Sequence, residues 1–333
     1  MSKKTILGII FYMIFFIFMY YFEWFSWVIS VILLLSIYFF IFSVIYFAFS
    51  KLFTKKLVSF KEIFIRFMYR FALFFSLTII FLWMFFYYQN KINPAKLPEY
   101  TLSNWKKTVV FQTMAHIWSD DFYNKIIQNI SKRKKDWFVL FFEWVKPWNE
   151  ENMNKFNLIL WVNFDKSTYT NLSKLYWLRA QDNEEFLWII NNRDFNIDIS
   201  IDEIIEKYTS KNIESSKQLK IPIDIEKGVD EIVNNLSDNE MKLLVYINRW
   251  IMNFIIKNDF VQDFATEKLW KTDIFEVILN DRNNVVSDNV IKSDYDKIYV
   301  LYWLMHFRWV LENLQKNDKS WKIASIDYYY PIK

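Results

Sequence analysis

The chain has 333 residues, of which 53% are hydrophobic, and a formal net charge of +4. This modest charge, without a dense basic stripe, argues against a nucleic-acid-binding protein. The chain contains no cysteine, which excludes disulfides and metal sites built from thiolates.

Three uncharged, strongly apolar runs lie near the N-terminus, at about 5–22, 25–50 and 71–88. A run of about 20 apolar residues is long enough to cross a bilayer as a helix. The sequence therefore predicts a three-helix transmembrane anchor over residues 1–92, with the lipid bilayer as its partner. The alternative is a buried helical hairpin of a soluble protein, which fits three successive runs less well.

Basic residues are concentrated before the first run and between the second and third. Lys3 and Lys4 precede the first run, and the connector 51–70 holds several Lys and Arg residues against the single Glu62. Because cytoplasmic loops carry an excess of Lys and Arg, this pattern places the N-terminus in the cytoplasm. We therefore expect a multi-pass protein of the cell membrane whose C-terminal domain is extracytoplasmic.

The rest of the chain is charged, mixed and punctuated by turns. A linker at 93–104 is expected to lead into a soluble domain at 105–333, in which strand-like runs alternate with helical segments. This alternation is typical of an α/β domain, and we expect a mainly parallel sheet flanked by helices. The expected strands lie at 108–113, 137–142, 195–201, 297–302 and 321–329.

The composition is abnormal in glycine and tryptophan. The chain has 2 glycines and 16 tryptophans, whereas average usage would give roughly 23 glycines. Several tryptophans stand where a turn favours glycine. We therefore expect many of them to be glycine in the natural protein, through reading of the UGA codon as glycine; the alternative is a genuinely tryptophan-rich membrane protein. The turn positions are Trp105, Trp137, Trp148 and Trp321.

The only two histidines, His116 and His306, each follow a β-rich run and precede a helix. Glu143 also stands where a strand is expected to end. Sites of α/β proteins lie at the carboxyl ends of strands, and two imidazoles with a carboxylate are common ligands of a catalytic metal. We therefore predict that His116, Glu143 and His306 hold a divalent metal ion. The alternative is that both histidines are structural.

Two more charged residues are candidates for the same site. Arg282 is expected to bind a carboxylate or to stabilise an oxyanion, and the alternative is a surface salt bridge. Asp198, in a strand-like stretch, is a further candidate carboxylate. Glu143 would activate water or bind the metal, and the division between these two roles stays open.

The arrangement resembles the TraB/PrgY/Tiki superfamily, which is related to GumN-type proteins. The family pattern has two distant Gly-x-x-His motifs, a Glu at a strand end between them, and an Arg or Arg-Asn before the second motif. Here the first motif has Thr113 in place of glycine, and the second has Trp303. The matching stretches, within about 105–330, are VVFQTMAHIWS with His116, VLFFEWVKPW with Glu143, NDRNN with Arg282 and Asn283, and YVLYWLMHFRW with His306.

The resemblance implies a metal-dependent, peptidase-like hydrolase that acts on an extracytoplasmic peptide or protein. In such a hydrolase Glu143 and Arg282 would be catalytic residues, and Asn283 would belong to the same site. One alternative is a non-catalytic receptor or sequestering protein for a peptide signal. Another is a membrane scaffold with a degenerate enzyme domain.

Overall fold

A computed structural model describes most of the chain, which divides into two compact units. Residues 1–88 with 236–243 form the first unit, and residues 89–235 with 244–333 form the second. The described residues are 10, 13–14, 17, 25–53, 59–144, 146–160, 162–165, 167–181, 188–210, 222–264 and 273–332.

The first unit contains two long helices, α2 (Phe25–Phe53) and α3 (Phe60–Tyr87). They contact one another through aromatic edges, such as the rings of Tyr46 and Phe67, whose centroids are 6.4 Å apart. Edge-to-face packing of this kind is the favoured geometry of aromatic pairs. A short π-helix, Tyr88–Ile92, follows α3.

The predicted three-helix transmembrane anchor is wrong. Among the described residues, no helix is long and apolar enough to cross a membrane. The run 71–88 is not a separate helix, because α3 begins at Phe60 and its first three turns carry Lys61, Glu62, Arg66 and Arg70. The run 25–50 lies within α2, and most of the run 5–22 lies outside the described residues. The bilayer as a partner and the extracytoplasmic location stay predictions.

The second unit is built on a six-stranded sheet with the order β10-β1-β2-β9-β4-β7. The pairs β2–β9, β9–β4 and β4–β7 are parallel, whereas β1 pairs antiparallel with β2 and with β10. The prediction of an α/β domain with a mainly parallel sheet is confirmed. The strands are β1 (Leu97–Asn104), β2 (Lys107–Met114), β4 (Val139–Phe142), β7 (Phe195–Asn196), β9 (Lys297–Trp303) and β10 (Lys322–Tyr329).

The sheet has helices on both faces because its strands are apolar on both faces. Successive side chains of a strand point to opposite faces, so Val109 and Phe111 pack on one side and Val110 on the other. The first side is covered by α12 (Asp273–Lys292) and α13 (Phe307–Asn317). The second is covered by α4 (Asp120–Lys135). Parallel sheets are typically covered on both faces in this way.

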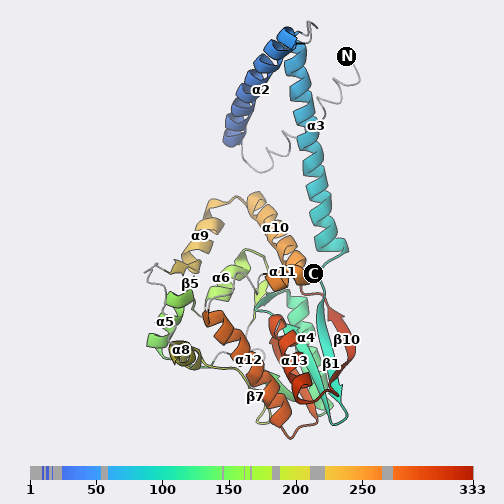
Figure 1. Ribbon diagram of the computed structural model, residues 1–333, viewed down its shortest axis with the longest axis vertical. Helices are drawn as coiled ribbons and strands as arrows, with labels where there is room; N and C mark the ends of the chain where they lie inside the picture. Colours follow the sequence, from blue (N-terminus) through green and yellow to red (C-terminus); the bar gives the residue numbers. More distant parts are fainter. Residues whose placement is uncertain are drawn as a thin grey trace. The chain divides into compact units, whose positions relative to one another are not determined.

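The segment expected as a linker contributes a strand. β1 occupies 97–104 and lies between β2 and β10, so strands from the two ends of this unit are side by side (Figure 1).

The remaining described helices are α5 (Glu150–Leu160), α6 (Thr168–Lys174), α8 (Ile201–Ser210), α9 (Ile225–Asn235), α10 (Asp238–Lys257) and α11 (Asp259–Phe264). Two further pairs of short strands are β3 (Ile117–Trp118) with β6 (Arg179–Ala180), and β5 (Val162–Asn163) with β8 (Ile223–Asp224).

Candidate functional site

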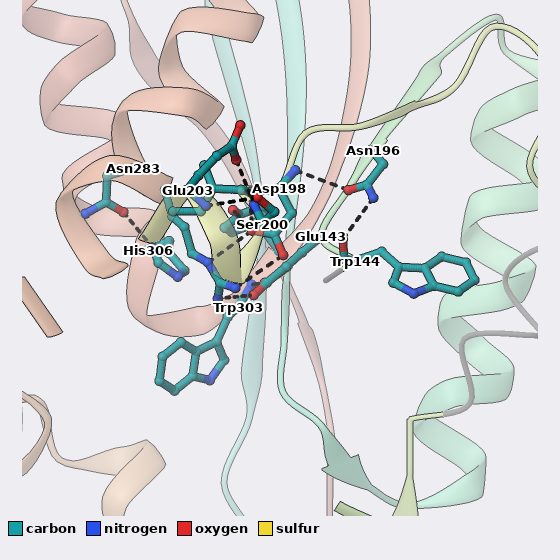
Figure 2. A network of polar contacts seen from close by, with 12 residues as sticks. Glu143, Trp144, Asn196, Asp198, Ser200, Glu203, Asn283, Trp303 and His306 are labelled. Carbon is teal, nitrogen blue, oxygen red and sulfur yellow. Dashed lines mark hydrogen bonds and ion pairs between the residues drawn. The ribbon is translucent and has the colours of Figure 1, made fainter. Parts of the chain in front are cut away.

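Polar side chains gather at the carboxyl ends of three neighbouring parallel strands. Glu143 directly follows β4, Asp198 lies two residues beyond β7, and Trp303 ends β9. The backbone N–H of Glu143 donates to the carbonyl of Leu301 at 3.1 Å, which holds Glu143 against the end of β9. Figure 2 shows Glu143, Asp198 and Trp303 close together at this edge of the sheet. Such strand ends are where α/β folds place their ligand sites.

Arg282 of α12 bridges the two carboxylates. Its Nη1 lies 3.0 Å from Oε1 of Glu143, and its Nε lies 3.0 Å from Oδ1 of Asp198, although the Nε–H bond is not aimed at that oxygen. The Arg282 side chain is 13% exposed, that of Glu143 9%, and that of Asp198 not at all. Ion pairs this far out of water depend on each other, because removing one partner leaves a buried charge without compensation. The alternative of a surface salt bridge is therefore excluded for Arg282, which contacts two buried carboxylates.

One guanidinium faces two carboxylates in this cluster. Burial raises the pKa of Asp198 to about 6, although the charge of Arg282 acts in the opposite direction. Burial also raises the pKa of Glu143, again against Arg282 and against the hydrogen bond from the Trp303 N–H. Burial disfavours the charged form of Arg282, but Asp198 and Glu143 outweigh this and raise its pKa. The cluster can therefore take up a proton near pH 6 while Arg282 stays charged.

Glu143 is further fixed by the chain that follows β9. Its Oε2 accepts a hydrogen bond from the backbone N–H of Trp303 at 2.9 Å. A carboxylate has about four lone-pair positions, so the bonds from Arg282 and Trp303 leave acceptor capacity for a further group. This matters because a general base must be within hydrogen-bond reach of the proton that it removes.

His306 is completely buried and is oriented by Asn283. The Nδ1 of His306 lies 2.7 Å from Oδ1 of Asn283, and no hydrogen-bond partner of its Nε2 is present in the described residues. Because an amide oxygen only accepts, Nδ1 carries the hydrogen and Nε2 has a free lone pair. Burial, with Arg282 nearby, lowers the pKa of His306 well below its ordinary value. The ring is therefore neutral at pH 7.

His116 lies between β2 and β3 and contacts a different element. Its ring is stacked at a tilt of 31° on the ring of Tyr169 of α6, with centroids 4.2 Å apart. Burial, with a smaller effect of Arg282, lowers the pKa of His116 to about 4. Burial, with the negative charge of Glu143, raises the pKa of Tyr169 to about 12. At neutral pH both side chains are therefore uncharged and able to donate or accept hydrogen bonds.

A small cavity joins His116 to Glu143. Its volume is about 10 Å³, which is room for about one water molecule. His306 is not among the lining residues, so the cavity brings together one of the two histidines and the glutamate. It is lined by Met114, Ala115, His116, Glu143, Gln181, Leu301, Tyr302 and Trp303.

The metal-binding prediction is wrong for the part of the chain that is described. No group of three His, Cys, Asp or Glu side chains in it is placed to hold a metal ion. His306 directs Nδ1 to Asn283, and both oxygens of Glu143 already accept hydrogen bonds. Arg282 also supplies, beside Glu143 and Asp198, the positive charge that a divalent ion would bring. The residues present therefore do not fit the predicted three-ligand centre.

Sequence reasoning missed Tyr302, Tyr169 and Gln181. Tyr302 lies in the apolar run of β9, where it was expected only as core, yet its hydroxyl donates to Oδ1 of Asp198 at 3.4 Å. Its position next to Trp303 at the end of the strand was the one signal available. Tyr169 and Gln181 lie between the expected strands 137–142 and 195–201, where no motif marked them.

Comparison of the chain with protein-family models, with curated proteins and with solved structures finds no match. The resemblance to the TraB/PrgY/Tiki superfamily therefore rests on the motifs alone and stays a prediction. The function has to be inferred from the side chains of the site themselves.

Proposed function

We propose that the α/β domain is a hydrolase acting on a peptide or protein, in which Glu143 is the general base. The observation that carries the proposal is the water-sized cavity lined by both His116 and Glu143. The substrate class comes from the resemblance of the motifs to the TraB/PrgY/Tiki pattern. The lipid bilayer and a metal ion have no role in this proposal.

The chemistry follows from the charges around the cavity. A desolvated carboxylate with a raised pKa is a stronger base than an exposed one. Glu143 would take a proton from a water in the cavity while that water attacks the carbonyl carbon of the substrate. A C–O bond forms, the C–N bond breaks, and the proton on Glu143 passes to the departing amine. Arg282 would position Glu143 and stabilise the negative charge on the substrate oxygen.

His116 is proposed to orient the water. Its pKa of about 4 keeps the imidazole neutral at pH 7, so one ring nitrogen can accept a hydrogen bond from water while the other donates. Contact with the Tyr169 ring fixes the plane of the imidazole. Orientation of a reactant by such fixed groups lowers the entropic part of the barrier.

A second candidate is a receptor that binds a peptide without cleaving it. The observation in its favour is that both oxygens of Glu143 already accept hydrogen bonds, from Arg282 and from the Trp303 N–H. In this case the Glu143–Arg282–Asp198 cluster would have a structural role, and Glu143 would not transfer a proton.

A direct cleavage assay distinguishes the hydrolase from the receptor. The purified full chain is incubated with a mixture of defined peptides, and new termini are detected by mass spectrometry. Cleavage that is lost in Glu143→Gln and kept in Glu151→Gln supports the hydrolase, since Glu151 is an exposed glutamate of α5. Binding of a peptide without cleavage supports the receptor. Cleavage at an equal rate in Glu143→Gln contradicts the role of Glu143.

A further inference from the structure

In the described part of the chain, three residues other than glycine have a positive φ, and all three are tryptophan. The φ angles are 36° at Trp105, 67° at Trp137 and 46° at Trp177. The Cβ atom of an L-residue clashes with the backbone in this region, and a bulky side chain there is a genuine outlier. Glycine has no Cβ and adopts these angles readily. Each tryptophan therefore stands where the backbone favours glycine.

Trp105 occupies the tip of the hairpin between β1 and β2. Asn104 pairs with Lys107, so the loop has two residues, and Trp105 is the first of them. With positive φ at the first loop residue alone, the turn is of type II′, which has glycine at that position. The indole is 90% exposed, so burial does not compensate for the strained backbone.

Trp137 occupies the position just beyond the C-cap of α4. Its N–H donates to the carbonyl of Lys134 at 3.1 Å, and the N–H of Phe138 donates to the carbonyl of Arg133 at 3.0 Å. This pair of bonds defines a Schellman motif, in which the residue after the C-cap is left-handed and usually glycine. Here too the indole lies mostly in solvent, since Trp137 is 75% exposed.

Trp177 repeats this arrangement after α6. Its N–H donates to the carbonyl of Lys174 at 3.3 Å, and the N–H of Leu178 donates to the carbonyl of Ser173 at 3.3 Å. The motif is again that of Schellman, with Trp177 in the place of its glycine. Trp177 is 51% exposed. Three independent turns thus carry tryptophan at the one position where each turn requires glycine.

We infer that positions 105, 137 and 177 are glycine in the protein as its own cells make it, through a codon that those cells read as glycine. The chain's 2 glycines against 16 tryptophans fit the same exchange. It does not extend to every turn expected from the sequence. Trp148 and Trp321 do not have a positive φ, and Trp321 is 2% exposed within the core.

The identity of the three residues is tested on the natural protein by peptide mass spectrometry, together with the codons of the gene. We expect glycine at positions 105, 137 and 177. Tryptophan at these three positions would overturn the inference. The outcome does not depend on whether the protein has any activity.

Variants of the tryptophan-containing chain test the physical argument. Trp105→Gly, Trp137→Gly and Trp177→Gly are each expected to raise the melting temperature, because they relieve a strained backbone. Trp321→Gly is the matched control, since it removes a buried indole at an ordinary φ and is expected to lower the melting temperature. A fall in melting temperature in all four variants would contradict the argument.

Discussion

The imidazole of His306 and the amide of Asn283 are joined by a 2.7 Å contact between Nδ1 and Oδ1, and both side chains are buried. This contact fixes the tautomer of a histidine that stands beyond β9, using a residue of α12. The direction of the hydrogen follows from the amide oxygen, which has no hydrogen to give. The pair therefore links the helix that carries Arg282 to the turn that follows the strand.

Asn283→Ala is expected to lower the free energy of unfolding by about 1–3 kcal/mol, because it leaves the Nδ1–H of His306 buried without an acceptor. Chemical denaturation measures the loss. Asn284→Ala is the matched control, since Asn284 is exposed and bonded only to the side chain of Asn313 in the described structure. An equal effect of both variants would contradict the role of Asn283 as the buried acceptor for His306.

Arg282→Met is expected to lower the free energy of unfolding by about 3–5 kcal/mol, because it leaves two buried carboxylates without a cation. Chemical denaturation measures the loss. Lys207→Met removes an ion pair with Asp281 whose lysine side chain is 49% exposed, and it should cost about 1 kcal/mol or less. In the double variant Arg282→Met with Asp198→Asn, one of the two carboxylates is neutral, so part of the lost stability should return. Additive losses in a double-mutant cycle would show that Arg282 and Asp198 are not coupled.

His116 should make the protein less stable in acid. Its pKa falls from the ordinary value of 6.5 to about 4 on folding, so between these values unfolding takes up a proton and acid favours the unfolded state. Compared with His116→Gln, the unchanged chain should lose stability as the pH falls from 6.5 to 4. Denaturation curves of both proteins across this range measure the difference. A constant difference would mean that the pKa of His116 is not lowered by folding.

Asp198 should make the protein less stable as the pH rises, which is opposite to the effect of His116. Its pKa rises from the ordinary value of 3.8 to about 6 on folding, so the folded state keeps a proton that the unfolded state has already lost. Compared with Asp198→Asn, the unchanged chain should lose stability as the pH rises from 3.8 to 6. The same curves test this, and a gain of stability over that range would contradict a raised pKa.

The architecture of the second unit followed from strand patterns in the sequence. Apolar runs around Phe111 and Val300 indicated strands buried on both faces, and their alternation with helices indicated a parallel sheet. The proximity of His116 to Glu143 followed in turn, because the carboxyl ends of parallel strands meet at one edge. The transmembrane prediction failed where α3 extends an apolar run through a charged segment.

The hydrogen-bond and ion-pair partners of the site residues could not be predicted, because they depend on how distant segments pack and not on the neighbouring sequence. Asn283 is adjacent to Arg282 in the chain, yet one binds His306 and the other binds Glu143 and Asp198. Which residue faces which follows from the rotation of α12 against the sheet. The Trp303 N–H that occupies Glu143 is likewise a backbone group that no residue pattern reveals.

The two-residue loop between β1 and β2 has a practical consequence for producing this protein. If position 105 is encoded by UGA, a host that reads UGA as stop releases a chain of at most 104 residues. Such a fragment ends with β1 and lacks β2, β4, β7, β9 and β10, so none of the parallel strands is synthesised. A synthetic gene with unambiguous glycine codons at positions 105, 137 and 177 would remove these three stops, so that such a host could continue synthesis into the strands that follow.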